Sequence, residues 1–257
     1  MSSIFYNDTG EGLPVVFLHG YCETSDIWTG VQNQLSGKFR VITVDLPGFG
    51  GSPLLTYEFS LDDVAIEIKN FLDSIGIKRF VLIGHSMGGY IALAFSRLFE
   101  DQLLGLGLFH SNIFEDDKAK KEIRTKLMDF IKKNGVKTFV KTFVPSLFFS
   151  ENINSLSEII GSLKKSAAQT PAESVIQYAR AMRDRKGSEM SIQNFSQPVM
   201  FIIGEKDTSV PFQKSLDQIS IPKNTHVLRL SDTGHMGMFE KSIESTRFIE
   251  GFLSFCK

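Results

Sequence analysis

The sequence predicts an α/β protein with a mostly parallel sheet that carries helices on both faces. Short and almost wholly apolar runs recur along the chain, which is typical of strands buried on both faces. Amphipathic helical stretches separate these runs, and this alternation indicates a mostly parallel sheet. Between two of the later strands the alternation gives way to a long helical stretch, which predicts an insertion.

The first half of the chain supplies most of the expected strands. They are expected over residues 14–19, 40–46, 80–84 and 103–109. A helix is expected over residues 60–75, because apolar side chains recur there at helical spacing and Gly76 follows them. Sheets of this kind place functional groups on the loops after the carboxyl ends of their strands, so candidate site residues are sought there.

The segment over residues 112–197 is expected to be helical throughout. Apolar side chains recur at helical spacing over residues 117–133. Thr170 and Glu173 form the pattern of a capping box, with a proline at the first helical position between them. An insertion at this point of the chain would lie over the carboxyl ends of the strands as a lid.

Strands resume after this segment. They are expected from Val199 and over residues 225–230, and a final helix is expected over residues 239–255. The predicted domains are a core and a helical cap, inserted between two late strands: residues 1–111 and 198–257 for the core, and residues 112–197 for the cap.

The composition is ordinary for a globular protein. The chain has 257 residues, which is enough for one large domain with an insertion, and 42% of them are hydrophobic and 22% charged. A formal net charge of −1 gives no support for binding nucleic acid or an anionic membrane surface. Nucleic acid and membranes are therefore not expected partners.

The termini and the cysteines bear on location and on metals. The opening MSSIFYNDTG has neither a basic segment nor an apolar core, so no signal peptide is expected, and no stretch has the apolar length of a membrane span. Cys22 and Cys256 lie almost at opposite ends, without metal-like spacing to histidine. We expect a cytoplasmic protein with no metal site.

Residues 84–88, GHSMG, fit the pattern G-x-S-x-G between an expected strand and an expected helix. A strand that turns into a helix within one residue forces that residue into a strained conformation and brings the two backbones close together. Only glycine fits beside such a turn. The strain would hold the Ser86 hydroxyl over the sheet, at the positive end of the new helix.

With this motif the chain resembles the serine hydrolases of the α/β-hydrolase fold, of the carboxylesterase-like kind with a helical lid. The resemblance implies the chain order serine, acid, histidine on separate loops. Asp207 lies in GEKDTSVP directly after one expected strand, and His235 lies in DTGH after the next. Both match the family's positions, so the resemblance implies a catalytic triad of Ser86, Asp207 and His235.

The resemblance extends to the loop that would hold the oxyanion. Residues 17–21, FLHGY, end a strand with a histidine–glycine turn, as the family's oxyanion loop does. The implied donors are the backbone N–H groups of Tyr21 and Met87. Residues 45–52, DLPGFGGS, match a further family signature, and their glycines do not spell a dinucleotide-binding pattern. No cofactor is expected.

Other ionisable residues near these motifs leave alternatives open. Asp116 or Asp117, after the strand over residues 103–109, could supply the acid from the position that some relatives use. His110 could line the site, although a hydrogen-bonded structural role suits a strand-end histidine better. The rest are interpreted as solvated, structural or supporting groups: Glu205, His226, His19, His85 and Cys22.

Aromatic side chains crowd one stretch of the inserted segment. We expect Phe139, Phe143 and Phe148 to line a substrate pocket together with Trp28, which lies just beyond the oxyanion loop. Such a pocket suits an acyl or aryl substrate of modest size and low charge. The basic residues over 180–186 are interpreted as a solvated helix face instead.

These observations predict a metal-independent serine hydrolase that cleaves small apolar esters through an acyl-enzyme intermediate. The same triad also resembles those of carbon–carbon bond hydrolases, perhydrolases and some lyases. A serine at position 86 excludes haloalkane dehalogenases and epoxide hydrolases, which need an aspartate there. A hypothesis from another class is a ligand-sensing protein that turns over slowly. The natural substrate and the oligomeric state do not follow from the sequence.

Overall fold

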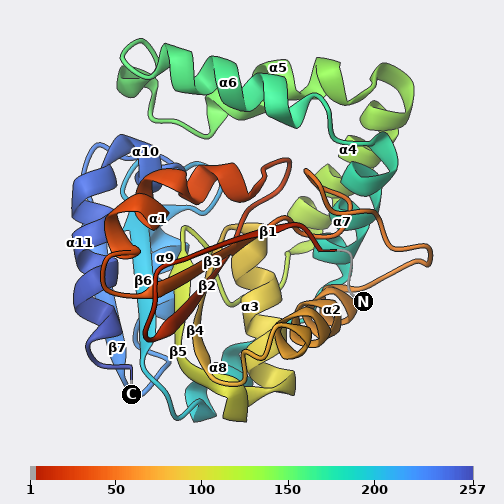
Figure 1. Cartoon of the computed structure of the whole chain (residues 1–257). Helices are drawn as coiled ribbons and strands as arrows, with labels where there is room; N and C mark the ends of the chain where they lie inside the picture. Colours follow the sequence, from red (N-terminus) through yellow and green to blue (C-terminus); the bar gives the residue numbers. More distant parts are fainter. Residues whose placement is uncertain (1–3, 257) are drawn as a thin grey trace.

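A sheet of seven strands lies at the centre of the computed structural model, which describes residues 4–256 (Figure 1). The strand order is β1-β3-β2-β4-β5-β6-β7, and every neighbouring pair is parallel except β1 and β3. The strands are β1 (Tyr6–Thr9), β2 (Pro14–Leu18), β3 (Arg40–Val44), β4 (Phe80–His85), β5 (Leu103–Phe109), β6 (Val199–Gly204) and β7 (Thr225–Leu230). The predicted fold class, a mostly parallel sheet covered by helices, is confirmed.

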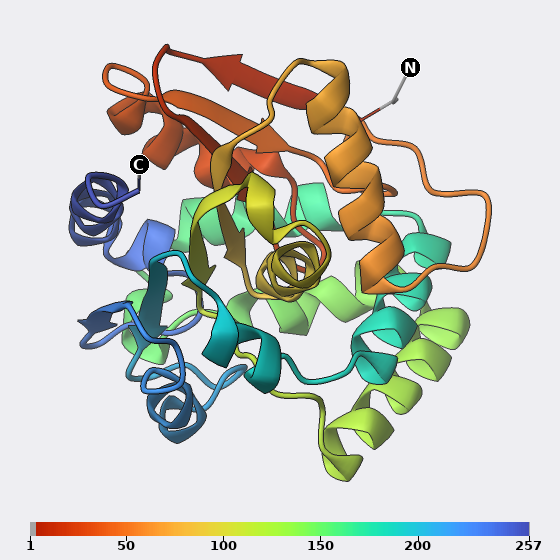
Figure 2. The same ribbon diagram turned by 90° about the horizontal axis from the view of Figure 1, so that it is seen from below.

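The helices cover both faces of this sheet. Viewed from below, α1 and α11 lie on one face, and α2 and α3 lie on the other (Figure 2). The helices outside the inserted segment are α1 (Thr29–Leu35), α2 (Leu61–Ser74), α3 (Met87–Leu98), α9 (Phe212–Gln218), α10 (Gly237–Glu240) and α11 (Ser242–Leu253). Because both faces are covered, β4, β5 and β6 are buried along their whole length, which explains their continuous apolar sequences.

Helix α2 illustrates how local sequence sets the ends of an element. Ser60 accepts a hydrogen bond from the Asp63 backbone N–H, and the Asp63 carboxylate accepts one from the Ser60 N–H, which completes a capping box. Gly76 follows the helix with φ +77°, a conformation that glycine adopts without steric cost. The apolar stripe of α2 packs on α3, as the spacing predicts, and Phe71 of this stripe contacts Tyr6 of β1.

The segment between β5 and β6 is helical, as predicted. It contains α4 (Lys118–Asn134), α5 (Val136–Ser146), α6 (Ser157–Ala167), α7 (Ala172–Asp184) and α8 (Glu189–Asn194). Helices α5 and α6 pack against each other beyond the edge of the sheet where the parallel strands end (Figure 1). Helix α8 packs on α3 beside the sheet instead, so only the earlier helices reach over that edge.

The part of the inserted segment that carries α4 to α7 leaves and rejoins the core at one place. The backbone N–H of Ser188 donates to the carbonyl oxygen of Ile113 over 2.7 Å. The Ile113 N–H donates in turn to the side-chain oxygen of Gln218 on α9. Both ends of the segment are therefore fixed to the core within hydrogen-bonding distance of each other.

Three local features differ from the prediction. Strand β1 has the polar sequence YNDT with every residue exposed, so an edge strand without an apolar face gave no signal. Pro171 takes an extended conformation at the N-cap of α7 without a side-chain cap, so the expected capping box does not form. The final helix is divided into α10 and α11, because Lys241 between them has a non-helical backbone with φ −140° and ψ 52°.

Among residues 4–256, no helix has both the length and the apolar character needed to cross a membrane.

Candidate active site

Ser86 lies at the sharp turn between β4 and α3. Its backbone has φ 49° and ψ −113°, a strained conformation for a residue with a side chain. A Cβ atom on Gly84 would lie 2.2 Å from the carbonyl oxygen of Gly88, and one on Gly88 would lie 2.6 Å from that of His19. Both glycines are therefore required, as the motif predicts, and the turn holds Ser86 at the carboxyl edge of the sheet.

Asp207 and His235 meet at the same edge. The His235 Nδ1 atom lies 2.7 Å from Asp207 Oδ2, and both side chains are buried. The other carboxylate oxygen of Asp207 accepts hydrogen bonds from the backbone N–H groups of Ser209 and Val210. The loop after β6 thus fixes the Asp207 carboxylate, and that carboxylate fixes the orientation of the His235 imidazole.

The electrostatics keep Asp207 ionised. Burial alone would raise the pKa of Asp207, but the charge of His235, its hydrogen bond and the nearby His110 side chain hold that pKa well below its usual range. An ionised carboxylate at this distance fixes the imidazole tautomer with a proton on Nδ1. Nε2 of His235 is then free to accept a proton.

His85 connects the Ser86 turn to the His235 loop. Its Nε2 atom lies 2.9 Å from the backbone oxygen of His235, and the two rings are 4.9 Å apart between centroids. The backbone N–H of His235 donates to the carbonyl oxygen of Leu147, at the end of α5. The structure therefore brings together the loops that carry the three predicted catalytic residues, Ser86, Asp207 and His235.

The loop after β2 lies beside the Ser86 turn. Strands β2 and β4 are neighbours, with Leu18 paired to Gly84. The His19 Nε2 atom accepts a hydrogen bond from the Leu46 N–H, and its Nδ1 faces the carbonyl oxygen of Gly20. This arrangement fixes the backbone just before Tyr21 and gives His19 the supporting role that the sequence indicates.

His110 contacts the acid of the site from the end of β5. Its Nε2 atom accepts a hydrogen bond from the Gly237 N–H over 3.2 Å, so Nδ1 carries the proton. That Nδ1 lies 3.3 Å from Asp207 Oδ2. His110 is fully buried and therefore supports Asp207 rather than lining a pocket. Ligand atoms of His110, Asp207 and His235 lie within 4.8 Å of one another. The hydrogen bond between His235 and Asp207 and the ion-pair contact between His110 and Asp207 account for that cluster.

Burial makes His110 a source of acid sensitivity. It lowers the pKa of His110 to about 4, whereas an unfolded histidine binds its proton near pH 6.5. The contribution of His110 to the free energy of unfolding is therefore fully present above pH 6.5. It is lost as the pH drops toward 4, by up to about 3 kcal/mol. We expect His110→Asn to flatten this dependence in urea unfolding measured from pH 7 to pH 4. Parallel curves for the variant and the wild type would contradict it.

The alternative acids are engaged elsewhere. Asp116 is paired with Arg124 and Arg185, and Asp117 caps α4 by accepting from the Lys120 N–H. These pairings exclude both from contact with His235 in this structure. Glu205 pairs with Arg229 on the surface, as its interpretation as a loop charge predicts, while His226 packs on α11.

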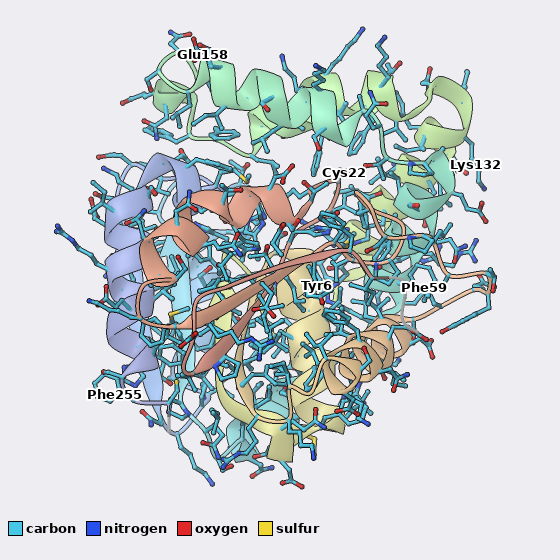
Figure 3. All side chains as sticks on the ribbon, in the orientation of Figure 1. Tyr6, Cys22, Phe59, Lys132, Glu158 and Phe255 are labelled. Atoms are coloured by element: carbon cyan, nitrogen blue, oxygen red, sulfur yellow. The ribbon has the colours of Figure 1, made fainter. Side chains whose placement is uncertain are left out.

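The aromatic residues divide into two groups. The rings of Phe139 and Phe143 are stacked at 4.6 Å on α5, and both lie edge-on to Tyr21 at 6.4 and 6.0 Å. Phe148 is buried and contacts Phe239. The labelled Cys22, next to Tyr21, lies just below α5 and α6 (Figure 3). Helix α5 therefore lies above the loop after β2.

The prediction that Trp28 lines the pocket is wrong for this structure. Its side chain has no exposed area and packs in the core against Phe17 and Phe109. The short 3-10 turn that precedes α1 directs the indole inward, beneath the loop after β2. The prediction rested on the position of Trp28 just after the expected oxyanion loop, and that position does not tell which way the indole points.

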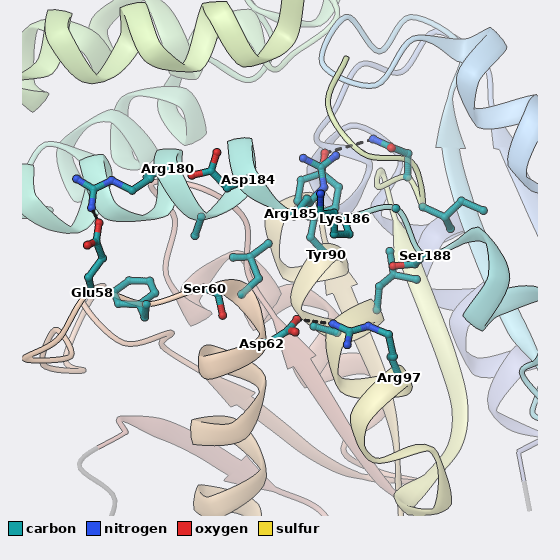
Figure 4. A pocket seen from close by; sticks show the side chains of 18 residues that line it. Glu58, Ser60, Asp62, Tyr90, Arg97, Arg180, Asp184, Arg185, Lys186 and Ser188 are labelled. Carbon is teal, nitrogen blue, oxygen red and sulfur yellow. Dashed lines mark hydrogen bonds and ion pairs between the residues drawn. The ribbon is translucent and has the colours of Figure 1, made fainter. Parts of the chain in front are cut away.

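A cavity of about 550 Å³ lies between α2, α3 and the end of α7 (Figure 4). It contains neither Asp207 nor His235. Arg180 pairs with Glu58 at one side of it, and Arg97 pairs with Asp62 at another. The sequence predicts that the basic residues at the end of α7 form a solvated helix face. In the structure Arg180 and Arg185 pair with acids and line this cavity instead. Arg185, for example, lies 3.8 Å from the centre of the Tyr90 ring and is half-buried.

Sequence reasoning missed two buried or partly buried acids that join the loops of the site. Glu23 accepts from the Gly20 N–H and contacts His85. Glu240 accepts from the N–H groups of Gly234 and Phe149, so it joins the His235 loop to the segment after α5. Neither belongs to a motif, and an isolated acid in a loop or a short helix carries no sequence signal for such a role.

Three comparisons relate the chain to known proteins. Residues 14–116 match the alpha/beta hydrolase fold family. A thermophilic esterase from Thermogutta terrifontis, solved with malate bound, is 27% identical, with a TM-score of 0.93 over 98% of this chain and 93% of that chain. The pimeloyl-[acyl-carrier protein] methyl ester esterase of Nitrosomonas europaea is 27% identical over 219 residues, 82% of this chain and 84% of that protein.

A further relative matches only part of the chain. The 2-hydroxy-6-oxononadienedioate/2-hydroxy-6-oxononatrienedioate hydrolase of Paraburkholderia phymatum is 36% identical over 106 residues, which are 39% of this chain and 37% of that protein.

Proposed function

Because this chain has the α/β-hydrolase fold, we propose that it is a serine hydrolase that cleaves small, largely apolar carboxylic esters through an acyl-enzyme intermediate. The observation that carries the proposal is the 2.7 Å contact between Asp207 and His235 at the sheet edge that holds the strained Ser86. A serine hydroxyl needs a base to become a nucleophile, and the base needs an acid to orient it.

The proposed reaction assigns one role to each group. His235 Nε2 takes the proton from the Ser86 hydroxyl as its oxygen attacks the ester carbonyl carbon. The backbone N–H groups of Tyr21 and Met87 stabilise the negative charge that develops on the carbonyl oxygen. His235 then gives the proton to the departing alcohol. Water attacks the acyl-enzyme by the same sequence and releases the acid and the free serine.

The surroundings support an apolar substrate. Phe139 and Phe143 are half-buried on α5, above the loop that would hold the oxyanion. In this proposal the helices α4 to α7 form the lid, and the two rings form the part of it that contacts the acyl group. The two relatives described above that match most of the chain are both named as esterases, which supports the same substrate class.

A burst experiment tests the proposal. Wild-type protein mixed with excess p-nitrophenyl acetate is expected to release p-nitrophenol in a burst proportional to enzyme, followed by slower steady turnover. Mass spectrometry of the quenched protein is expected to find an acetyl group on Ser86. Release without any acetyl-protein would contradict a serine acyl-enzyme. A stoichiometric burst without turnover would favour the ligand-sensing alternative.

A carbon–carbon bond hydrolase is the second candidate, and the partial match to the dienedioate hydrolase favours it. The discriminating measurement compares kcat/KM for p-nitrophenyl butyrate with that for a 2-hydroxy-6-oxo-dienoate. A ratio that favours the ester supports the first proposal, and a ratio that favours the dienoate supports the second.

We expect Phe143→Ala to raise KM for p-nitrophenyl butyrate more than for the acetate. A ring that contacts only the longer acyl chain loses buried area with that chain, and about 1–2 kcal/mol corresponds to a change of roughly tenfold. The change in kcat should be small, because the ring does not contact the reacting atoms. Phe130→Ala on the exposed face of α4 is the matched control and should alter neither constant. Equal changes in KM for both esters would contradict the assignment.

A further inference from the structure

A buried acid–base pair lies beside the proposed triad. Glu23 is 6% exposed and His85 has no exposed area. The Glu23 Oε2 atom lies 2.9 Å from His85 Nδ1, and the same oxygen accepts a hydrogen bond from the Gly20 N–H over 2.6 Å. His85 precedes Ser86, and Gly20 precedes Tyr21. The pair therefore connects the two backbone segments that must face each other in the proposed oxyanion hole.

The hydrogen bonds define the protonation state of His85. Its Nδ1 faces a carboxylate oxygen and its Nε2 faces the carbonyl oxygen of His235, 2.9 Å away. Burial opposes ionisation of Glu23, but the charge of His85 and the hydrogen bond from the Gly20 N–H lower the pKa of Glu23 below its usual value, so its carboxylate is ionised near neutral pH. An ionised carboxylate and a carbonyl oxygen only accept hydrogen bonds, so both ring nitrogens carry a hydrogen when the two contacts form. A doubly protonated imidazole is an imidazolium. His85 is thus charged, and a buried charge of this kind is stable only beside its counter-ion.

The two pKa values are consistent with this pairing. Burial would lower the pKa of His85, but the charge and hydrogen bond of Glu23 raise it above the usual value. Burial would raise the pKa of Glu23, and the charge of His85 lowers it below the usual value. Other titratable groups also face the pair: the charge of His19 acts on Glu23, and that of Asp207 acts on His85. The rings of His110 and His235 lie beside His85. Burial raises the pKa of Cys22, and the charge of Glu23 raises it further.

Gly20 shows how tightly the pair holds the loop. A Cβ atom at Gly20 would lie 2.7 Å from Glu23 Oε2 and 2.8 Å from His85 Nδ1. The backbone therefore passes directly against the ion pair. Loss of one charge would leave the other buried without a partner, so the remaining group would give up its charge, the Gly20 loop would move, or both.

We propose that Glu23 and His85 form a positioning ion pair, which sets the Tyr21 and Met87 amides in register for the oxyanion and holds the His235 loop against the Ser86 turn. The inference rests on the proposed function. Both residues act through the backbone of their neighbours and are positioning residues, because the groups they contact are Gly20 and His235.

The first test uses Glu23→Gln, which keeps the shape and an oxygen for the Gly20 N–H but removes the charge. We expect kcat for p-nitrophenyl butyrate to fall by about 10–100-fold while KM changes less than about threefold, since a misplaced oxyanion donor acts on the transition state. The matched control is Glu205→Gln, a loop carboxylate paired with Arg229 on the surface, which should leave both constants unchanged.

A sulfur substrate separates the oxyanion effect from a merely structural one. Sulfur is a weak hydrogen-bond acceptor, so a thionoester gains little from well-placed amide donors. For each protein, kcat/KM for the ester is divided by kcat/KM for its thionoester. This ratio should be about tenfold lower in Glu23→Gln than in the wild type. Thermal unfolding of the variant is measured alongside. An unchanged ratio in a folded, active variant contradicts the positioning role.

Nitrogen NMR of the histidines tests the pair without any assay of activity. The His85 ring of the wild type should show two protonated nitrogens at pH 7.5, and that of Glu23→Gln should show one. A singly protonated His85 in the wild type overturns the inference, whatever the activity. Absence of ester turnover in the wild type together with a doubly protonated His85 overturns the proposed function and leaves the ion pair established.

Discussion

Replacing Ser86 with alanine is expected to lower kcat for p-nitrophenyl acetate by about four to six orders of magnitude, because no other atom can form the acyl-enzyme. The turn that carries Ser86 should persist, since the two glycines that permit it are unchanged and alanine has the same backbone requirement. The residual rate above hydrolysis in buffer should be what substrate binding and the oxyanion donors supply without a nucleophile.

Steady-state and burst kinetics on wild type and Ser86→Ala measure this effect. Ser254→Ala, an exposed serine at the end of α11, is the matched control and should keep the full burst. Equal turnover by wild type and Ser86→Ala would show that the G-x-S-x-G turn does not carry the nucleophile. The proposed function would then fail.

Asp207→Asn is expected to lower kcat by about 10⁴-fold with little change in KM. The Oδ1 atom of Asp207 accepts from the Ser209 and Val210 N–H groups, so an asparagine would keep its oxygen there and turn its NH₂ group toward His235. The NH₂ group can only donate, which places the histidine proton on Nε2. His235 could then no longer accept a proton from Ser86.

The matched control is Asp232→Asn in the loop before His235. Asp232 is exposed and has φ 48°, a conformation that asparagine also tolerates, so the variant should keep wild-type kinetics. The measurement is kcat for p-nitrophenyl butyrate together with the rate of labelling by a fluorophosphonate. A rate for Asp207→Asn within tenfold of the wild type would remove Asp207 from its proposed role.

The elements that sequence predicts well are those whose burial is uniform. Strands β4, β5 and β6 are apolar throughout because helices cover both their faces, and this gives an unambiguous signal. Strand β1 has no buried face, and its identity depends on pairing with β3, which local sequence does not record. The break at Lys241 likewise depends on how α10 and α11 pack.

The candidate site divides in the same way. Ser86, Asp207 and His235 occur in local motifs at strand ends, so sequence indicates them directly. Trp28 and Glu23 are different, because their roles depend on which way a side chain points after folding. The indole turns into the core, and the carboxylate turns under the loop to meet a histidine distant in sequence. Such pairings follow from tertiary contacts alone.

The hydrogen bond between the Ser188 N–H and the Ile113 oxygen closes the chain that carries α4 to α7 into a loop with both ends at one point. Because the segment starts and finishes at one point, its length can change without stretching the sheet, and the entropy of closing a longer loop grows only slowly. A graft from another protein could enter there while β5 and β6 keep their register. For the proposed hydrolase, the helices that would contact the acyl group can therefore change without altering the strand ends that carry Ser86 and the Asp207 loop.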